Sequence, residues 1–160
     1  MKMQTKDLAL ISVYAALYAV MVYLATPISF GVLQFRIAGA LRPGIAKKWT
    51  LAFGYGIGVL AANFVSPFAG PWDLVFMPFM AVIAGLSGYF IAKRFGQNYF
   101  ISGAVTATIA AVSLGFMFNE LGVATMLVAL LPLFLAEQAV CLIGAIIFRF
   151  IGSRYKWWMT

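Results

Sequence analysis

Residues 123–148 read VATMLVALLPLFLAEQAVCLIGAIIF, and the only charged side chain in this run is that of Glu137. A helix needs about 20 mostly apolar residues to cross the hydrocarbon core of a bilayer. The rest of the chain has the same character, since 64% of its 160 residues are hydrophobic, 9% are charged and the mean hydropathy is +1.01. Soluble domains are about 45–50% apolar and about 25% charged. The sequence therefore excludes a soluble globular domain and predicts an integral membrane protein.

Five further segments are predicted to cross the membrane. The first lacks the small-residue cleavage site of a removable signal peptide. The second carries Arg36 and Arg42 and is interrupted by Pro43-Gly44. The loops are short, so we expect residues 1–160 to form one membrane-embedded domain, an all-α bundle of six transmembrane helices. The predicted spans are residues 8–26, 29–46, 50–65, 73–92, 99–118 and 123–148.

The placement of the 11 lysine and arginine residues decides whether residues 29–46 cross the membrane. If they do, ten of the basic residues share one side with both termini, and only Arg36 lies toward the other side. Cytoplasmic loops carry an excess of Lys and Arg, so this pattern predicts a multi-pass plasma-membrane protein with both termini cytoplasmic. It also explains the net charge of +7 without nucleic acid as a partner. The ten residues are Lys2, Lys6, Arg42, Lys47, Lys48, Lys93, Arg94, Arg149, Arg154 and Lys156.

Several chemistries are excluded by composition. The chain has no histidine, which removes Ser-His-Asp triads, Cys-His pairs and His-ligated metals. Its single cysteine, Cys141, lies in an apolar run, so neither an intrachain disulfide nor a thiolate metal cluster is expected. We expect a protein that is not an enzyme, with no metal and no cofactor.

Polar residues inside the spans are the candidate functional residues, because ionisable groups within a membrane are costly and usually functional. Glu137 lies well inside the last span, where it either binds a ligand or has a structural role. The structural role would be an ion pair with Arg36 or a protonated carboxyl group hydrogen-bonded to a neighbour. Asp73 opens the fourth span, where the helix dipole alone favours a carboxylate. Asn63 ends the third span, where an amide often serves only to hydrogen-bond another helix. The predicted pocket opens to the outside, and its substrate-binding residues are Gln34, Arg36, Asn63, Trp72, Asp73 and Glu137.

Residues 27–37, PISFGVLQFRI, resemble the segment after the first span in the queuosine-precursor (QueT-type) transporter family. Further matches follow at Ala62-Asn63, at Asp73, and at Glu137 with Gly144 and the residues after it. Members are S components, the substrate-binding subunits of energy-coupling factor (ECF) transporters. The resemblance implies a six-helix bundle that captures the deazaguanines preQ0 or preQ1. It also implies assembly with a membrane coupling subunit (ECF-T) and two cytoplasmic ATPase subunits.

The sequence departs from the family at Ala38-Gly39, where the family usually reads Ser-Glu. A related S component for another heterocycle, such as a thiamine-pathway pyrimidine, is therefore an alternative. Two more are a stand-alone transporter that couples protons through Glu137 and a structural subunit without a ligand.

Ala15 and Ala19 in the first span form a small-xxx-small step that permits close helix approach. S components carry such an alanine pair on their first helix, so the resemblance implies that these residues contact the coupling subunit. The alternative is packing within the chain.

Overall fold

The computed structural model describes residues 5–30 and 35–159, and every regular element in these ranges is a helix. The prediction of an all-helical protein is thus confirmed for the described residues. The elements are α1 (Thr5–Leu24), α2 (Thr26–Ser29), the 3₁₀ helix η1 (Ile37–Lys47), α3 (Leu51–Asn63), the π-helical turn η2 (Trp72–Phe76), α4 (Met77–Arg94), α5 (Tyr99–Glu120), α6 (Met126–Arg154) and the 3₁₀ helix η3 (Trp157–Met159).

Four of the described helices are long and apolar enough to cross a membrane: α1, Trp72–Arg94, α5 and α6. They correspond to the predicted spans 8–26, 73–92, 99–118 and 123–148, although α1 ends at Leu24 and α6 begins at Met126. Helix α3 is apolar but has only 13 residues. Four crossings are therefore supported by length and composition, and the count of six stays a prediction.

The second predicted span, residues 29–46, does not form one regular helix. Its start belongs to α2, residues 31–34 lie outside the described residues, and its second half is the 11-residue 3₁₀ helix η1. A 3₁₀ helix rises about 2.0 Å per residue, so η1 extends about 22 Å, which is less than the roughly 30 Å of a bilayer core. Pro43 lies inside η1 and has no N–H for a helical hydrogen bond.

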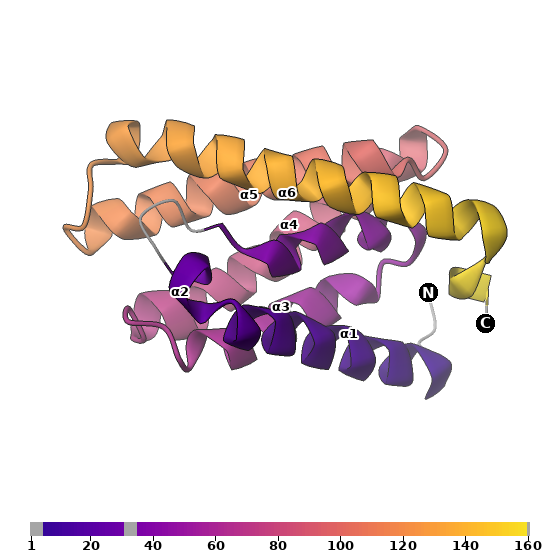
Figure 1. Ribbon diagram of the computed structural model, residues 1–160, viewed down its shortest axis with the longest axis horizontal. Coiled ribbons are helices and arrows are strands. Elements are labelled where there is room, and N and C mark those ends of the chain that lie inside the picture. Colours follow the sequence, from indigo (N-terminus) through magenta and orange to yellow (C-terminus); the bar gives the residue numbers. More distant parts are fainter. Residues whose placement is uncertain (1–4, 31–34, 160) are drawn as a thin grey trace.

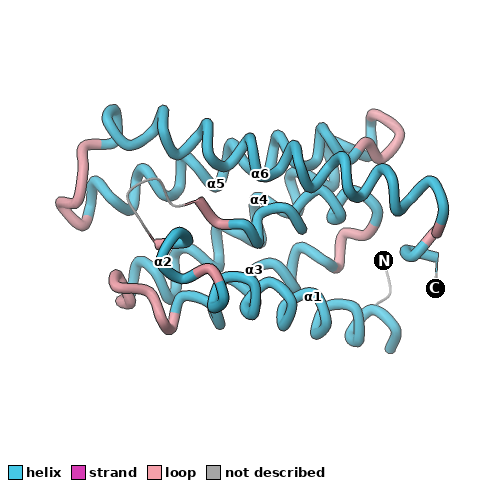
Figure 2. Tube along the Cα trace, in the orientation of Figure 1, coloured by secondary structure: helices cyan, strands magenta, loops and turns pink. Residues whose placement is uncertain are grey.

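The helices run roughly along the long axis of an elongated bundle, with both termini at one end (Figure 1). Figure 2 shows the same arrangement with loops confined mainly to the two ends. α1 packs on α3, α3 on α4, α4 on α5, and α5 on α6. η1 lies inside this set and contacts α1, α4, α5 and α6. The residues of η1 are thus placed at the centre of the bundle.

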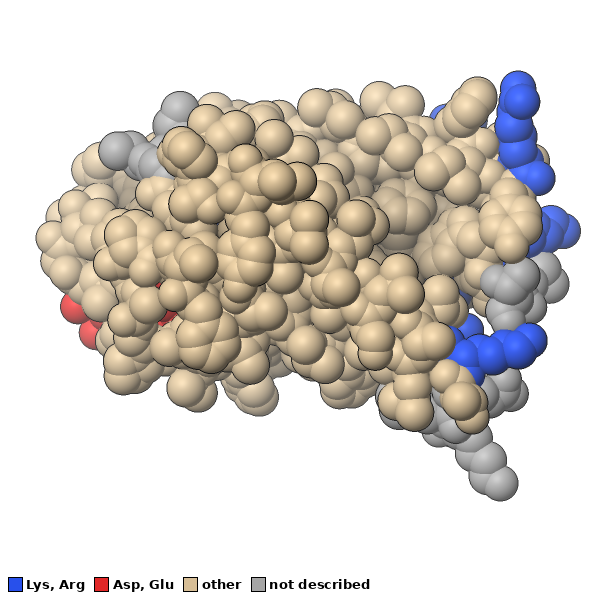
Figure 3. Space-filling model, turned by 60° about the horizontal axis from the view of Figure 1, so that its bottom comes forward, with Lys and Arg blue, Asp and Glu red and all other residues tan. Residues whose placement is uncertain are grey.

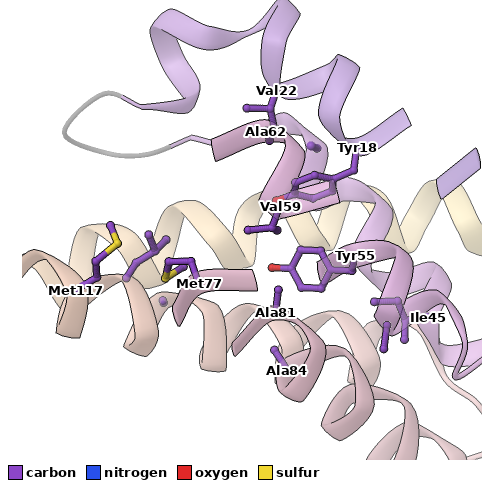
Figure 4. Close-up of a cluster of buried hydrophobic side chains, with 14 of the residues drawn as sticks. Tyr18, Val22, Ile45, Tyr55, Val59, Ala62, Met77, Ala81, Ala84 and Met117 are labelled. Atoms are coloured by element: carbon purple, nitrogen blue, oxygen red, sulfur yellow. The ribbon is translucent and has the colours of Figure 1, made fainter. Parts of the chain in front are cut away.

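The centre of the core is aromatic and aliphatic, with Tyr18, Tyr55, Val59 and Met77 converging from α1, α3 and α4 (Figure 4). Tyr18 and Tyr55 stack at a tilt with ring centroids 5.3 Å apart. Small residues let α1 approach α3 closely: a Cβ added at Gly58 would lie 2.8 Å from the Cβ of Tyr18.

Charged side chains are segregated along the long axis. Lys and Arg gather at the end that carries the termini, acidic atoms lie at the opposite end, and the visible side between them is uncharged (Figure 3). Large apolar side chains are exposed along the helices, among them Leu127 at 89% and Val128 at 70%. An apolar girdle between polar ends is the surface that a bilayer requires.

The close packing of η1 against α6 predicts a strong effect of Gly144→Ala. A Cβ at this position would overlap the backbone of Ala40, which side-chain motion cannot relieve. Overpacking of this kind costs about 1–3 kcal/mol, so the thermal unfolding temperature in detergent should fall. Gly115→Ala is the matched control, since its nearest neighbour would be 3.7 Å away. Equal unfolding temperatures for the two variants would contradict this packing.

Candidate functional site

Glu137 and Arg42 form an ion pair at the centre of the bundle. Arg42 Nη1 donates a hydrogen bond to Glu137 Oε2, and both side chains are about 1–2% exposed. Arg42 also lies over the ring of Tyr55, with its Cζ 5.2 Å from the ring centroid. Glu137 Oε1 and Arg42 Nε have no hydrogen-bond partner among the described residues. The pair is therefore held in place but leaves one acceptor and one donor unused.

This pairing corrects two sequence-based expectations. Arg42 was counted with the basic residues of the cytoplasmic side, but it is buried inside the bundle. The partner of Glu137 is Arg42 rather than Arg36. The reason is the geometry of η1: a 3₁₀ helix has about three residues per turn, so a residue two turns beyond Arg36 returns to the same inward side.

Gly39 makes room for the guanidinium of Arg42. A Cβ at Gly39 would lie 3.2 Å from Arg42 Cζ and 3.3 Å from a methyl group of Val140. Any larger side chain at this position therefore has to displace Arg42 or α6. The departure at Ala38-Gly39 lies directly beside the buried ion pair.

Arg36 precedes η1 and is also buried, with 2% exposure. Its Cζ lies 5.1 Å from the ring centroid of Phe30, within the range of a cation–π interaction. Its Nε and Nη2 have no hydrogen-bond partner among the described residues. Its charge also acts on Asp73. Arg36 is therefore a second buried cation with unused donors.

Asp73 and Asn63 are joined by hydrogen bonds. Asn63 Nδ2 donates to the Oδ1 of Asp73 at 2.7 Å and to its backbone carbonyl at 2.8 Å. Both residues are 0% exposed, so Asp73 is buried in the π-helical turn η2 rather than placed at a solvated helix start. Asp73 Oδ2 has no hydrogen-bond partner among the described residues. Asn63 and Asp73 are therefore in direct contact, with one oxygen of the Asp73 carboxylate left over.

Of the two remaining predicted site residues, the structure describes Trp72. Trp72 packs edge-on against Phe76 and Phe116, with centroid distances of 5.4 and 5.7 Å. Gln34 lies outside the described residues.

Ala15 and Ala19 are each 7% exposed on the face of α1 that packs inside the bundle. The carbonyl of Ala15 would lie 3.1 Å from a Cβ at Gly58. This chain therefore uses the alanine face for internal packing on α3, and its contact with a coupling subunit stays a prediction.

Two spaces adjoin the charged group. The inner space has a volume of about 10 Å³ for the centre of a water molecule, so it holds about one water. The outer one measures about 370 Å³ and lies beside the connection between α5 and α6. Arg36 lines the inner space, Phe30 lines the outer one, and these two side chains contact each other. The inner space is lined by Arg36, Arg42, Tyr55, Val59, Met77, Met80, Ala81, Ala110, Ser113 and Leu114, and the outer space by Phe30, Phe68, Phe118, Val123, Ala124, Val128, Ala129 and Pro132.

The sequence-based analysis missed Arg42, Tyr55 and Ser113 as residues around the inner space. Arg42 carried a usable signal, because it lies six residues after Arg36 in an otherwise apolar segment interrupted by Pro43-Gly44. Tyr55 and Ser113 carried none, since single tyrosines and serines are common in membrane spans.

A comparison with protein families matches residues 8–153 to a family described as QueT transporter. No curated protein and no solved structure matches the chain.

Proposed function

Because the chain belongs to the QueT transporter family, we propose that it is the substrate-binding S component of an ECF-type importer. Its substrate is a queuosine precursor, the deazaguanine preQ0 or preQ1. Residues 1–160 act as one substrate-binding domain rather than as an enzyme. The observation that carries the proposal is the group of buried, partly unpaired charges formed by Arg36, Arg42, Asp73 and Glu137 in a chain of this family.

A deazaguanine matches the hydrogen-bonding groups that this site leaves unused. The guanine-like edge offers adjacent N–H donors and a carbonyl acceptor. A carboxylate accepts such donors in charge-assisted bonds, which are stronger than neutral ones. Glu137 Oε1 is the free acceptor for the N–H groups, and the free guanidinium N–H groups of Arg36 and Arg42 suit the carbonyl. Asp73 Oδ2 is a second free acceptor, suited to the ammonium of preQ1.

The apolar outer space suits the flat face of the base. Small-molecule sites are mostly apolar with a few polar groups that fix orientation, and the phenylalanines of this space offer stacking faces. The inner space is too small for a heterocycle in this state. Binding therefore requires Arg36 to leave Phe30, which joins the two spaces and brings the polar edge of the ligand to Glu137 and Arg42.

The Arg42–Glu137 ion pair weighs against the stand-alone proton-coupled transporter. A carboxylate that exchanges protons has to lose its charge during the cycle, and here that would leave Arg42 charged and unpaired in the core. Removing one partner of a buried ion pair costs about 3–5 kcal/mol. An importer subunit avoids this cost, since ATPase subunits supply the energy.

We further infer six membrane crossings with both termini cytoplasmic. The segregation of Lys and Arg to the terminus-bearing end supports this orientation. η1 and α3 then make up the two shorter crossings, and η1 is sheltered from lipid by the four helices around it. Irregular backbone at membrane depth is tolerated where protein buries it.

This topology predicts a labelling pattern for single-cysteine variants. A membrane-impermeant maleimide should label Pro67→Cys and Glu120→Cys on intact cells, but Lys93→Cys and Ser153→Cys only after permeabilisation. All four parent side chains are exposed at the ends of the bundle, whereas native Cys141 is 2% exposed and contributes little background. Labelling of Lys93→Cys or Ser153→Cys on intact cells would overturn the proposed orientation.

Mass spectrometry of the small molecules and proteins that co-purify tests the proposed function. The protein expressed with its coupling partners should retain a deazaguanine and carry one membrane subunit and two ATPases. A retained pyrimidine would instead support the other S-component class. Transport in proteoliposomes by this chain alone, driven by a proton gradient, would contradict the proposal.

A further inference from the structure

A basic cavity at the terminus-bearing end of the bundle is separate from the substrate site. It measures about 360 Å³ and lies between the end of η1, the α4–α5 loop and the last third of α6. Lys47 and Arg149 contribute its cationic side chains, and the loop contributes backbone and amide groups. Its lining residues are Lys47, Phe95, Gly96, Gln97, Asn98, Tyr99, Phe100 and Arg149.

The cations of this cavity have no carboxylate partner among the described residues that line it. The chain has only four acidic side chains. Asp7 forms an ion pair with Lys48, with 2.6 Å between Asp7 Oδ1 and Lys48 Nζ. Asp73 and Glu137 belong to the proposed substrate site. Glu120 is at the far end of α5. At about 1.5 Å per residue, the length of α5 places Glu120 roughly 30 Å away. The cavity thus has an uncompensated positive charge.

The side chain of Lys47 is held in position by two aromatic rings. Its Nζ lies 4.9 Å from the ring centroids of both Tyr99 and Trp158. A pre-positioned cation loses less conformational entropy when it binds an anion.

The loop between α4 and α5 adds N–H donors on the same side. Gly96 and Gln97 both have positive φ values, 68° and 57°, which turn the chain sharply into α5. The Asn98 side chain accepts a hydrogen bond from the N–H of Phe100. The N–H groups of Tyr99 and Ile101 have no intrahelical acceptor, as in the first turn of any helix. This helix end therefore adds a favourable potential for an anion beside the two cations.

We propose that this cavity binds the phosphodiester head group of an anionic membrane lipid. Basic pockets between helices at one face of a membrane bind such head groups. The cavity also has the surroundings of a lipid rather than of a free ion, because Phe95, which lines it, is 62% exposed and offers apolar surface to an acyl chain. Tyr99 and Trp158 next to Lys47 are residue types that concentrate at the membrane–water interface.

Native mass spectrometry of the protein released from lipid nanodiscs tests this proposal. The nanodiscs contain either phosphatidylcholine alone or phosphatidylcholine with phosphatidylglycerol. The wild-type chain should retain one phosphatidylglycerol, and Lys47→Gln/Arg149→Gln should retain it about 25-fold less, since each basic residue near an anionic lipid contributes about fivefold. The control Lys93→Gln/Arg94→Gln removes the same charge from two exposed side chains outside the cavity and should behave like the wild type.

Three outcomes would overturn the assignment. The first is unchanged retention in the cavity variant, and the second is equal loss in the cavity and control variants. The third is displacement of the lipid by inorganic phosphate at equal concentration, which would make a free phosphate the ligand. If the double variant does not fold, Arg149→Gln alone should lower retention about fivefold, because Arg149 is exposed and its loss spares the core. The test needs neither the ECF subunits nor a deazaguanine.

Discussion

Glu137→Gln is expected to lower both the stability of the empty protein and its affinity for a deazaguanine. The substitution leaves the Arg42 guanidinium buried without its counter-ion, and removing one partner of a buried ion pair costs about 3–5 kcal/mol. The amide also presents a donor to the N–H groups of the ligand. Hydrogen bonds to charged groups contribute about 1.5–3 kcal/mol, so affinity should fall about tenfold to more than a hundredfold. Thermal unfolding and calorimetry measure the two effects separately.

A double-mutant cycle separates the structural role of Glu137 from its binding role. Arg42→Gln alone should destabilise the protein by a similar amount, because it leaves Glu137 as the unpaired charge. Arg42→Gln/Glu137→Gln removes both charges and should cost less than the sum of the single changes. We expect the double variant to regain stability without regaining affinity. Recovery of wild-type affinity in the double variant would mean that Glu137 serves only to neutralise Arg42.

Asp73→Asn is expected to distinguish the two deazaguanines. The substitution keeps the size of the side chain, and its amide oxygen can still accept the hydrogen bond from Asn63 Nδ2. It removes the charge of the free Oδ2, which we assign to the ammonium of preQ1. Affinity for preQ1 should fall about tenfold or more beyond any loss for uncharged preQ0, since charge-assisted bonds are roughly twice as strong as neutral ones.

The ligand pair supplies the control in this experiment, since preQ0 and preQ1 share the ring and differ in the substituent. Unequal losses measured by calorimetry on one folded variant cannot come from misfolding. Equal losses for preQ0 and preQ1 would remove Asp73 from contact with the ammonium. Unchanged affinity for both would make Asp73 a structural partner of Asn63 only.

The long helices were predictable because their signal is strong and local. The runs ending near Arg94 and Glu120 and the run around Glu137 contain about 20 apolar residues each, and no soluble element competes with a membrane span of that length. The burial of Glu137 followed from the same argument, since polar groups inside a span face protein rather than lipid. The burial of Asp73 did not, because a carboxylate at a helix start is equally stable in solvent.

The segment 29–46 was not predictable in the same way. An α-helical reading places Arg42 toward the end of a span, where positive charges normally mark the cytoplasm. The chain instead forms the 3₁₀ helix η1, and this tighter winding turns Arg36 and Arg42 inward. That geometry depends on packing against four other helices, which no local pattern encodes. For the same reason the partner of Glu137 was assigned to the wrong arginine.

Equilibrium titration shows whether this chain by itself recognises a queuosine precursor, as we propose. The purified protein in nanodiscs, without ECF-T or ATPases, is titrated calorimetrically with preQ0, preQ1 and a thiamine-pathway pyrimidine. We predict saturable binding of a deazaguanine at one site per chain, weakened by Glu137→Gln, with no binding of the pyrimidine. Binding of the pyrimidine with no response to either deazaguanine, by a protein that remains folded, would contradict the account.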